Sequence, residues 1–190
     1  MKKINKIFAT ILILVGLMYL IKYSMEKDFS RILLCICSPI LVIFPRFLKN
    51  KVNDKLVFIY YIYLFILMTL GCLGRFYSKF TYYDVFAHFM FGFAGSIIGL
   101  YILNLFSIQD KNIVFNIIFM LFCTLALSSF WEIFEYIASI IFKEDVQNVL
   151  TTGVRDTMED IIASLISCGL FQIMYVLKKE KINNIVKCHQ

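Results

Sequence analysis

The chain has 190 residues, of which 61% are hydrophobic and 17% are charged, and its mean hydropathy is +0.80. A soluble domain is about half apolar and about a quarter charged, so this composition excludes an ordinary soluble protein and indicates a lipid bilayer as the main partner. A formal net charge of +6 would suit nucleic acid. The lysines and arginines, however, lie in short groups beside apolar runs, which is typical of membrane-flanking charge, so we expect no nucleic-acid partner.

Six apolar runs follow one another along the chain, each with about the length that a membrane-spanning helix needs. A bilayer core about 30 Å thick is crossed by about 20 apolar residues in a helix. The pattern predicts an all-α fold: a polytopic membrane helical bundle of about six transmembrane helices in a single integral membrane domain, residues 1–190. The runs are Ile7–Tyr23, Ile32–Leu48, Leu56–Tyr77, Val85–Phe106, Ile113–Phe142 and Met158–Leu177.

The first three runs are almost purely apolar and aromatic. The first follows three lysines, as the apolar part of a signal peptide does, but no pair of small residues for cleavage comes after it, so we interpret it as a retained helix. The second contains Pro39 and Pro45, which predict a kink or tilt. We expect these helices, residues 7–77, to shield the more polar helices of residues 78–177 from lipid.

The lysines and arginines of the connections predict the orientation, because cytoplasmic loops carry an excess of them. Twelve lie at the N-terminus, in Arg46–Lys55, in Gln109–Asn112 and in the C-terminal tail, against seven on the other side. Both termini are therefore expected in the cytoplasm, with the chain in the inner membrane of a bacterial cell. Residues 178–190 then form a basic cytoplasmic tail.

Ionisable residues of the last three runs gather at one end of the predicted bundle. The fourth run begins, the fifth ends and the sixth begins on the side opposite the termini, so residues at these three ends share one membrane depth near the outer face. The connection Lys143–Arg155 is expected to cover them. The residues concerned are Asp84, His88, Glu132, Glu135, Asp156, Glu159 and Asp160.

Helical spacing places these residues on one face of each helix, because residues three or four apart lie together. On each helix the same stripe continues into small residues, which mark close helix packing in membranes. The acids are therefore expected to point into the bundle rather than at lipid, whereas Glu159 lies about 100° around the helix from Asp160. The small residues are Gly92, Gly95 and Gly99, then Thr124, Ser128 and Ser139, then Ala163 and Ser167.

Taken one at a time, several of these residues have ordinary structural explanations. Asp84 and Asp156 suit helix caps, and a lone histidine such as His88 is more often a satisfied interior residue. Glu132 and Glu135 are harder to explain, because they lie late in a helix, where the dipole disfavours negative charge. Intramembrane acids are expensive and are functional candidates by default, so we predict a functional cluster.

The charge of the cluster is not balanced by its neighbours. Its six carboxylates carry −6 if all are ionised, whereas Arg75, Lys79 and Arg155 supply at most +3. Carboxylates clustered at low dielectric must bind protons or cations. The sequence leaves three kinds of function open, and it does not decide whether the protein is an enzyme.

The first is a site for a divalent cation such as Mg²⁺, Mn²⁺ or Ca²⁺, because carboxylates with one imidazole suit such ions. With one histidine inside the helices and no CxxC pair, the usual zinc and di-iron sites are excluded. The ion is expected to act on a lipid head group or another phosphate-bearing substrate, held by Arg75 and Arg155. The predicted metal ligands, which are also the candidate catalytic residues, are Asp84, His88, Glu132, Glu135, Asp156 and Asp160.

The second is a proton- or cation-coupled transporter in which the same residues exchange ions. Transporters usually place such sites near the midplane, in broken or repeated helices, whereas this cluster is expected near one surface and the chain shows no repeat. The third is a membrane scaffold whose polar cluster is only structural. The sequence carries no signal for an oligomeric state.

Three motifs in the second half of the chain resemble the YjdF-like family of small bacterial multi-pass membrane proteins. They are Tyr-Asp-x-x-x-His-Phe with a following Gly, Trp-Glu-x-x-Glu, and Asp-Thr-x-x-Asp. The resemblance covers residues 75–170, implies a multi-pass membrane fold and supports the cluster, but it implies no activity. The chain departs from the family pattern around Val154-Arg155 and Met158-Glu159. The matching residues are Tyr83, Asp84, His88, Phe89, Gly92, Glu132, Glu135, Asp156, Thr157 and Asp160.

Overall fold

The computed structural model describes residues 1–48, 52–108 and 112–186. Within these residues every regular element is a helix, and six helices are long and apolar enough to cross a membrane, which confirms the all-α, multi-pass prediction. Parts of the connections and of the basic tail counted above, residues 49–51, 109–111 and 187–190, lie outside the described residues. The spans are Lys2–Glu26, Phe29–Arg46, Asp54–Leu73, Tyr83–Leu105, Ile113–Phe142 and Arg155–Leu177.

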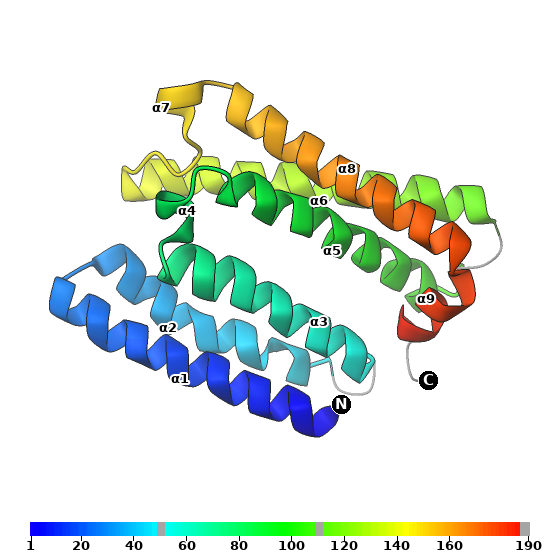
Figure 1. The fold of residues 1–190 in the computed structure, drawn as a ribbon, viewed down its shortest axis with the longest axis horizontal. Coiled ribbons are helices and arrows are strands. Elements are labelled where there is room, and N and C mark those ends of the chain that lie inside the picture. The colour runs from blue at the N-terminus through cyan, green and yellow to red at the C-terminus, as the bar shows by residue number, and fades with distance from the viewer. Residues whose placement is uncertain (49–51, 109–111, 187–190) are drawn as a thin grey trace. The chain divides into compact units, whose positions relative to one another are not determined.

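The described residues divide into two compact units, Met1–Tyr83 and Asp84–Val186. In the first, the helices α1, α2 and α3 pack side by side (Figure 1). The elements of this unit are α1 (Lys2–Glu26), α2 (Phe29–Ile43), the 3-10 helix η1 (Phe44–Arg46), α3 (Asp54–Leu64), the π-helix η2 (Phe65–Leu73) and α4 (Phe76–Lys79).

The two prolines of the second span occupy different positions. Pro39 lies inside α2, whereas Pro45 lies in η1, where the chain changes from α-helix to 3-10 helix. Proline has no N–H to donate and its ring crowds the preceding turn. The interruption expected from the two prolines therefore falls at Pro45, and α2 continues through Pro39.

Asp28 joins three segments of the first unit. It caps α2 by accepting a hydrogen bond of 3.2 Å from the backbone N–H of Arg31, and it pairs with the Arg31 guanidinium and with Arg75 Nη2. Burial raises the pKa of Asp28, but these hydrogen bonds and charges outweigh burial and hold the pKa below its ordinary value. Arg75 Nη2 also lies 3.0 Å from Glu26 Oε2, so the charge of Arg75 is neutralised within the first unit.

The second unit contains three long helices, α5, α6 and α8, which run alongside one another (Figure 1). At the end of these helices away from α7, Leu103 and Met120 belong to an apolar core that Val186 of α9 covers. The Asn104 side chain fixes α9 there by donating a hydrogen bond of 2.9 Å to the Val186 carbonyl. The elements are α5 (Tyr83–Leu105), α6 (Ile113–Phe142), α7 (Val149–Thr152), α8 (Arg155–Leu177) and α9 (Lys179–Val186).

Glycines allow α5 to approach α6 and α8 more closely than a side chain would permit. A Cβ at Gly92 would overlap the carbonyl oxygen of Ser164 in α8, and a Cβ at Gly95 would lie 2.8 Å from Thr124 Oγ1 in α6. The Ser164 hydroxyl uses this proximity to donate a hydrogen bond of 2.9 Å to the His88 carbonyl. All five residues are buried, so the stripes of small residues face the interior of the unit.

Gly92→Ala is expected to destabilise the protein by about 1–3 kcal/mol, because the added methyl group must displace the backbone of α8. Gly169→Ala is the matched control, since a Cβ at Gly169, which also lies within a helix, would meet no described atom within 4 Å. This control should be neutral or stabilising by up to about 1 kcal/mol through helix propensity. Thermal unfolding of the purified protein in detergent measures both effects. Equal melting temperatures for Gly92→Ala and the wild type would contradict the close packing.

Candidate functional site

Three helices of the second unit bring the six predicted metal ligands together at one end, and we call these residues the acidic cluster. Two come from the start of α5, two from the second half of α6 and two from the start of α8. They form three overlapping groups, in each of which one ligand atom per residue lies within 4.8 Å of the others. The groups are Asp84 with His88 and Glu135, His88 with Glu132 and Asp160, and Asp84 with Asp156 and Asp160.

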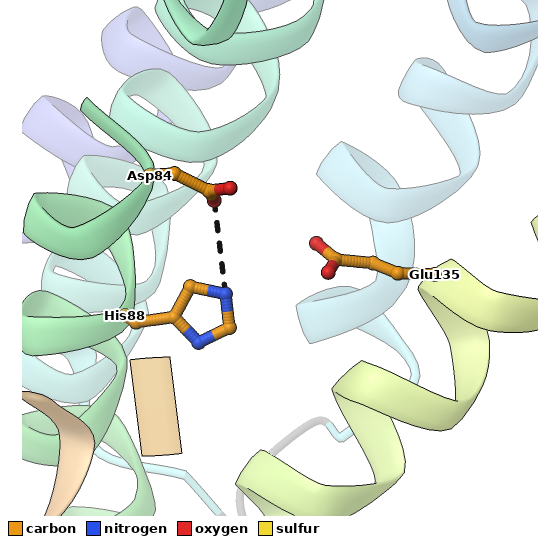
Figure 2. Close-up of side chains that lie close together, drawn as sticks. All are labelled: Asp84, His88 and Glu135. Carbon is orange, nitrogen blue, oxygen red and sulfur yellow. Dashed lines mark ion pairs between the residues drawn. The ribbon is translucent and has the colours of Figure 1, made fainter. Parts of the chain in front are cut away.

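The imidazole of His88 lies at the centre of the acidic cluster. Figure 2 shows that Asp84 and His88 of α5 and Glu135 of α6 point toward one another. The distances from His88 Nε2 exceed those of a hydrogen bond, so the ring is surrounded by carboxylates without being bound to any of them. They are 3.7 Å to Asp84 Oδ1, 3.6 Å to Glu132 Oε1 and 3.8 Å to Asp160 Oδ2.

Burial of the acidic cluster is deep. The relative exposure of His88 is 3%, that of Glu132 is 5% and that of Asp160 is 1%. Both ring nitrogens of His88, Glu132 Oε1 and Asp160 Oδ1 are buried without a hydrogen-bond partner among the described residues. Because nearly all buried polar atoms in folded proteins are paired, these four unpaired atoms single out this part of the cluster.

Neutral donors orient the carboxylates from outside. Trp131 Nε1 donates to Glu135 Oε1 at 2.8 Å, and Gln147 Nε2 donates to Glu132 Oε2 at 3.3 Å. Asn148, whose φ of 53° is left-handed, donates from Nδ2 to Asp156 Oδ2 at 2.9 Å. Such outer contacts fix the orientation of ligand carboxylates in metal sites. Here they leave Glu132 Oε1 unpaired and facing His88.

The connection between α6 and α8 supplies two of these donors. We expected Lys143–Arg155 to cover the cluster, and the structure places the Gln147 and Asn148 side chains of this connection on its carboxylates. The sequence analysis named Trp131 only as the first residue of the Trp-Glu-x-x-Glu motif, and it did not single out Gln147 or Asn148. Only Trp131 carried a signal, because it lies one helical turn from Glu135.

The two arginines predicted to hold a phosphate lie in different settings. Arg75 belongs to the first unit and pairs there with Glu26 and Asp28. Arg155, at the start of α8, is exposed and pairs with Glu159, whose Oε1 lies 2.7 Å from Arg155 Nε. Glu159 is therefore turned away from the acidic cluster. Among the described residues, no lysine or arginine forms an ion pair with a carboxylate of the cluster.

The helix ends explain only part of the acids, because Asp84 and Asp156 lie in the first turns of α5 and α8, where the dipole favours negative charge. The N-cap of α8 is Val154, without a side-chain cap, and Asp156 accepts its hydrogen bond from Asn148 instead, so the capping explanation is wrong for Asp156. α6 continues about two turns beyond Glu135, whereas the dipole acts only within the last turn. Burial, rather than the dipole, is what makes the charge of Glu135 costly.

Comparison with known protein families places the chain among membrane proteins. The model of the family described as Predicted membrane protein (DUF2238) matches residues 4–181, so the chain belongs to this family. The match includes the whole acidic cluster, and the predicted resemblance to YjdF-like membrane proteins is consistent with it. No curated protein and no solved structure matches the chain.

Asp160→Asn is expected to stabilise the protein by about 1 kcal/mol when a chelator is present, because it removes one buried charge and supplies an N–H₂ donor to the neighbouring carboxylates. Thermal unfolding in EDTA measures the effect. Glu159→Gln, one residue away but exposed, is the control and should change the melting temperature little. A clear loss of stability in Asp160→Asn would instead show that the cluster is a satisfied structural network.

Proposed function

We propose that this integral membrane protein binds a divalent cation in the acidic cluster and acts with it on a lipid or another phosphate-bearing substrate. The observation that carries the proposal is the surrounding of His88 by three carboxylates, with four buried atoms left unpaired. Oxygen and imidazole ligands converging at this spacing suit a metal ion, whereas an apolar or anionic ligand would find no complementary group.

The mixture of ligands favours Mn²⁺ among the three cations that the sequence suggested. Carboxylate oxygens suit Mg²⁺, Ca²⁺ and Mn²⁺ alike, but an imidazole nitrogen is a softer ligand and suits the transition metals. His88 lies at the centre of the cluster rather than at its rim. A cation held there would act as a Lewis acid on a phosphoryl oxygen.

Arg155 supports the assignment of a phosphate-bearing substrate. Its side chain is 77% exposed, and its ion pair with Glu159 is a surface pair that an incoming phosphate can replace. The adjacent start of α8 has no side-chain cap, so its first N–H groups remain available to an anion. Arg155 and the acidic cluster thus offer a phosphate contact and a cation on neighbouring turns of one helix.

We further propose that both termini lie in the cytoplasm and that the acidic cluster lies toward the outer leaflet of the inner membrane. The excess of lysine and arginine on the side of the termini supports this orientation. An even number of spans also places the two termini on one side. The cluster end of α5 then follows three crossings and faces outward, where lipid head groups are accessible.

A second candidate function, proton or cation transport, is favoured by a line of buried hydroxyl groups that leads from the cluster into the unit. Ser128 Oγ donates to Ser164 Oγ at 3.2 Å, and Ser96 Oγ lies 3.5 Å from Thr124 Oγ1. Beyond this line lies the core around Leu100, where the Asn116 amide donates to the Tyr175 hydroxyl at 3.0 Å but no described acid or histidine is buried. Because ions need polar steps across the whole bilayer, we rank transport below cation binding.

Mn²⁺ is expected to raise the melting temperature of the wild-type protein, by an amount equivalent to about 2.7 kcal/mol when free Mn²⁺ is 100 times the dissociation constant. Glu132→Gln should reduce both this rise and the manganese content found by elemental analysis, whereas the exposed Glu159→Gln should leave both unchanged. A wild-type protein that binds no metal would refute the proposal. Ion flux in proteoliposomes that disappears in Glu132→Gln, without bound metal, would establish the transporter instead.

The stabilisation by Mn²⁺ should also depend on pH, because carboxylate and imidazole ligands must lose their protons before they bind a cation. The bound state holds fewer protons than the free state, so the dissociation constant rises as the pH falls, by about tenfold per pH unit for each proton released. Titrations of the melting temperature with Mn²⁺ between about pH 5 and pH 8 measure this dependence. An affinity that does not change over this range would exclude the acidic cluster as the binding site.

A further inference from the structure

The ligand atoms of the acidic cluster fall into three groups of three rather than into one set around a single point. Its three groups overlap in pairs: the first two share His88, the second and third share Asp160, and the first and third share Asp84. Asp84 of the first group and Glu132 and Asp160 of the second all lie around the same ring nitrogen, His88 Nε2, so a cation on that nitrogen uses one of these two groups. The third group contains no histidine and does not compete with them for the ring.

Asp160 connects the deepest group to the third. Its Oδ2 lies 3.8 Å from His88 Nε2, whereas its Oδ1 is buried and has no hydrogen-bond partner among the described residues. A carboxylate with its two oxygens in such different settings can bind a cation on each side. Asp160 is 1% exposed, so neither oxygen is satisfied by bulk water.

Asp156 has no other assignment in the structure. It does not cap α8, and the described lysines and arginines form no ion pair with it. The Asn148 amide donates to its Oδ2 and so holds its carboxylate in one orientation. Asp84 and Asp160 each offer an oxygen within 4.8 Å of it.

The charge of the acidic cluster also favours two cations over one. With all five carboxylates ionised and a neutral imidazole the cluster would carry −5, so one divalent cation would leave −3 and two would leave −1. The donors that reach it from the described residues, Trp131, Gln147, Asn148 and Thr157, are all neutral. An excess of three buried negative charges is far more costly than an excess of one.

We infer that the acidic cluster binds two divalent cations, one with His88, Glu132 and Asp160 and one with Asp84, Asp156 and Asp160, bridged by the Asp160 carboxylate. The inference rests on the proposed cation-binding function and adds a second metal site to it. The first cation lies deeper, because all three of its ligands are buried, whereas Asp84 and Asp156 are only half-buried.

The test is the amount and the magnetic coupling of Mn²⁺ bound to the full-length protein in detergent, after removal of all metal and reloading. We expect two Mn²⁺ per chain by elemental analysis and an electron paramagnetic resonance spectrum of a coupled pair. Asp156→Asn should keep one Mn²⁺ per chain and show the hyperfine pattern of an isolated ion. Glu159→Gln, the matched control on the same helix, should keep both ions and their coupling.

A second variant tests the outer ion without changing a ligand. Asn148→Gly preserves the left-handed backbone at this position and removes the amide that orients Asp156, so it should weaken the second Mn²⁺ about tenfold and leave the first unchanged. Saturation of the wild type at one uncoupled Mn²⁺ per chain would overturn the inference while the proposed function stands. Absence of any bound Mn²⁺ would overturn both.

Discussion

The acidic cluster depends on the close approach of α5, α6 and α8 one helical turn away from it. Gly92 of α5 meets the backbone of Ser164 in α8, and Ser128 of α6 donates to the Ser164 hydroxyl at 3.2 Å. α5 and α8 both start at the cluster end, whereas α6 runs toward it, so one further turn along each helix leads to a ligand. Any side chain at Gly92 would therefore move ligands of two helices apart. These ligands are His88 of α5 and Asp160 of α8.

The groups that orient the carboxylates of the acidic cluster do not neutralise their charge. The donors include the indole of Trp131 and the amides of Gln147 and Asn148, which bind one carboxylate oxygen each and carry no charge. A lysine or arginine in their place would fix the same oxygens but would also cancel the charge that attracts a cation. Neutral donors keep the ligands in position and leave their negative charge available, which is what a cation site needs and what a structural salt bridge would not show.

The sequence predicted the helices and their inner faces because both follow from periodic patterns. Apolar length marks a span, and the spacing of His88 and Gly92 marks a buried face. Features that depend on the three-dimensional course of the chain could not be predicted from these patterns. The π-helix Phe65–Leu73 is as apolar as its neighbours and gives no separate signal, and the role of Asn148 depends on a left-handed turn. Arg75 seemed a phosphate ligand from its position in the chain, but its partners lie more than forty residues earlier in the sequence.

Residues 84–186 contain both the acidic cluster, which destabilises the unit, and the helix packing that holds the cluster together. At one end of α5, α6 and α8, buried carboxylates repel one another, and at the other end the same helices hold an apolar core that includes Leu103, Met120 and Val186. Helix association in a membrane relies on close packing rather than on the hydrophobic effect, so the packed end and the glycine contacts must hold the cluster in place when it is empty. In the proposed function a bound cation would remove this repulsion, and its binding free energy would add to the stability of the same three helices. Cation affinity and fold stability are for this reason two measurements of one arrangement.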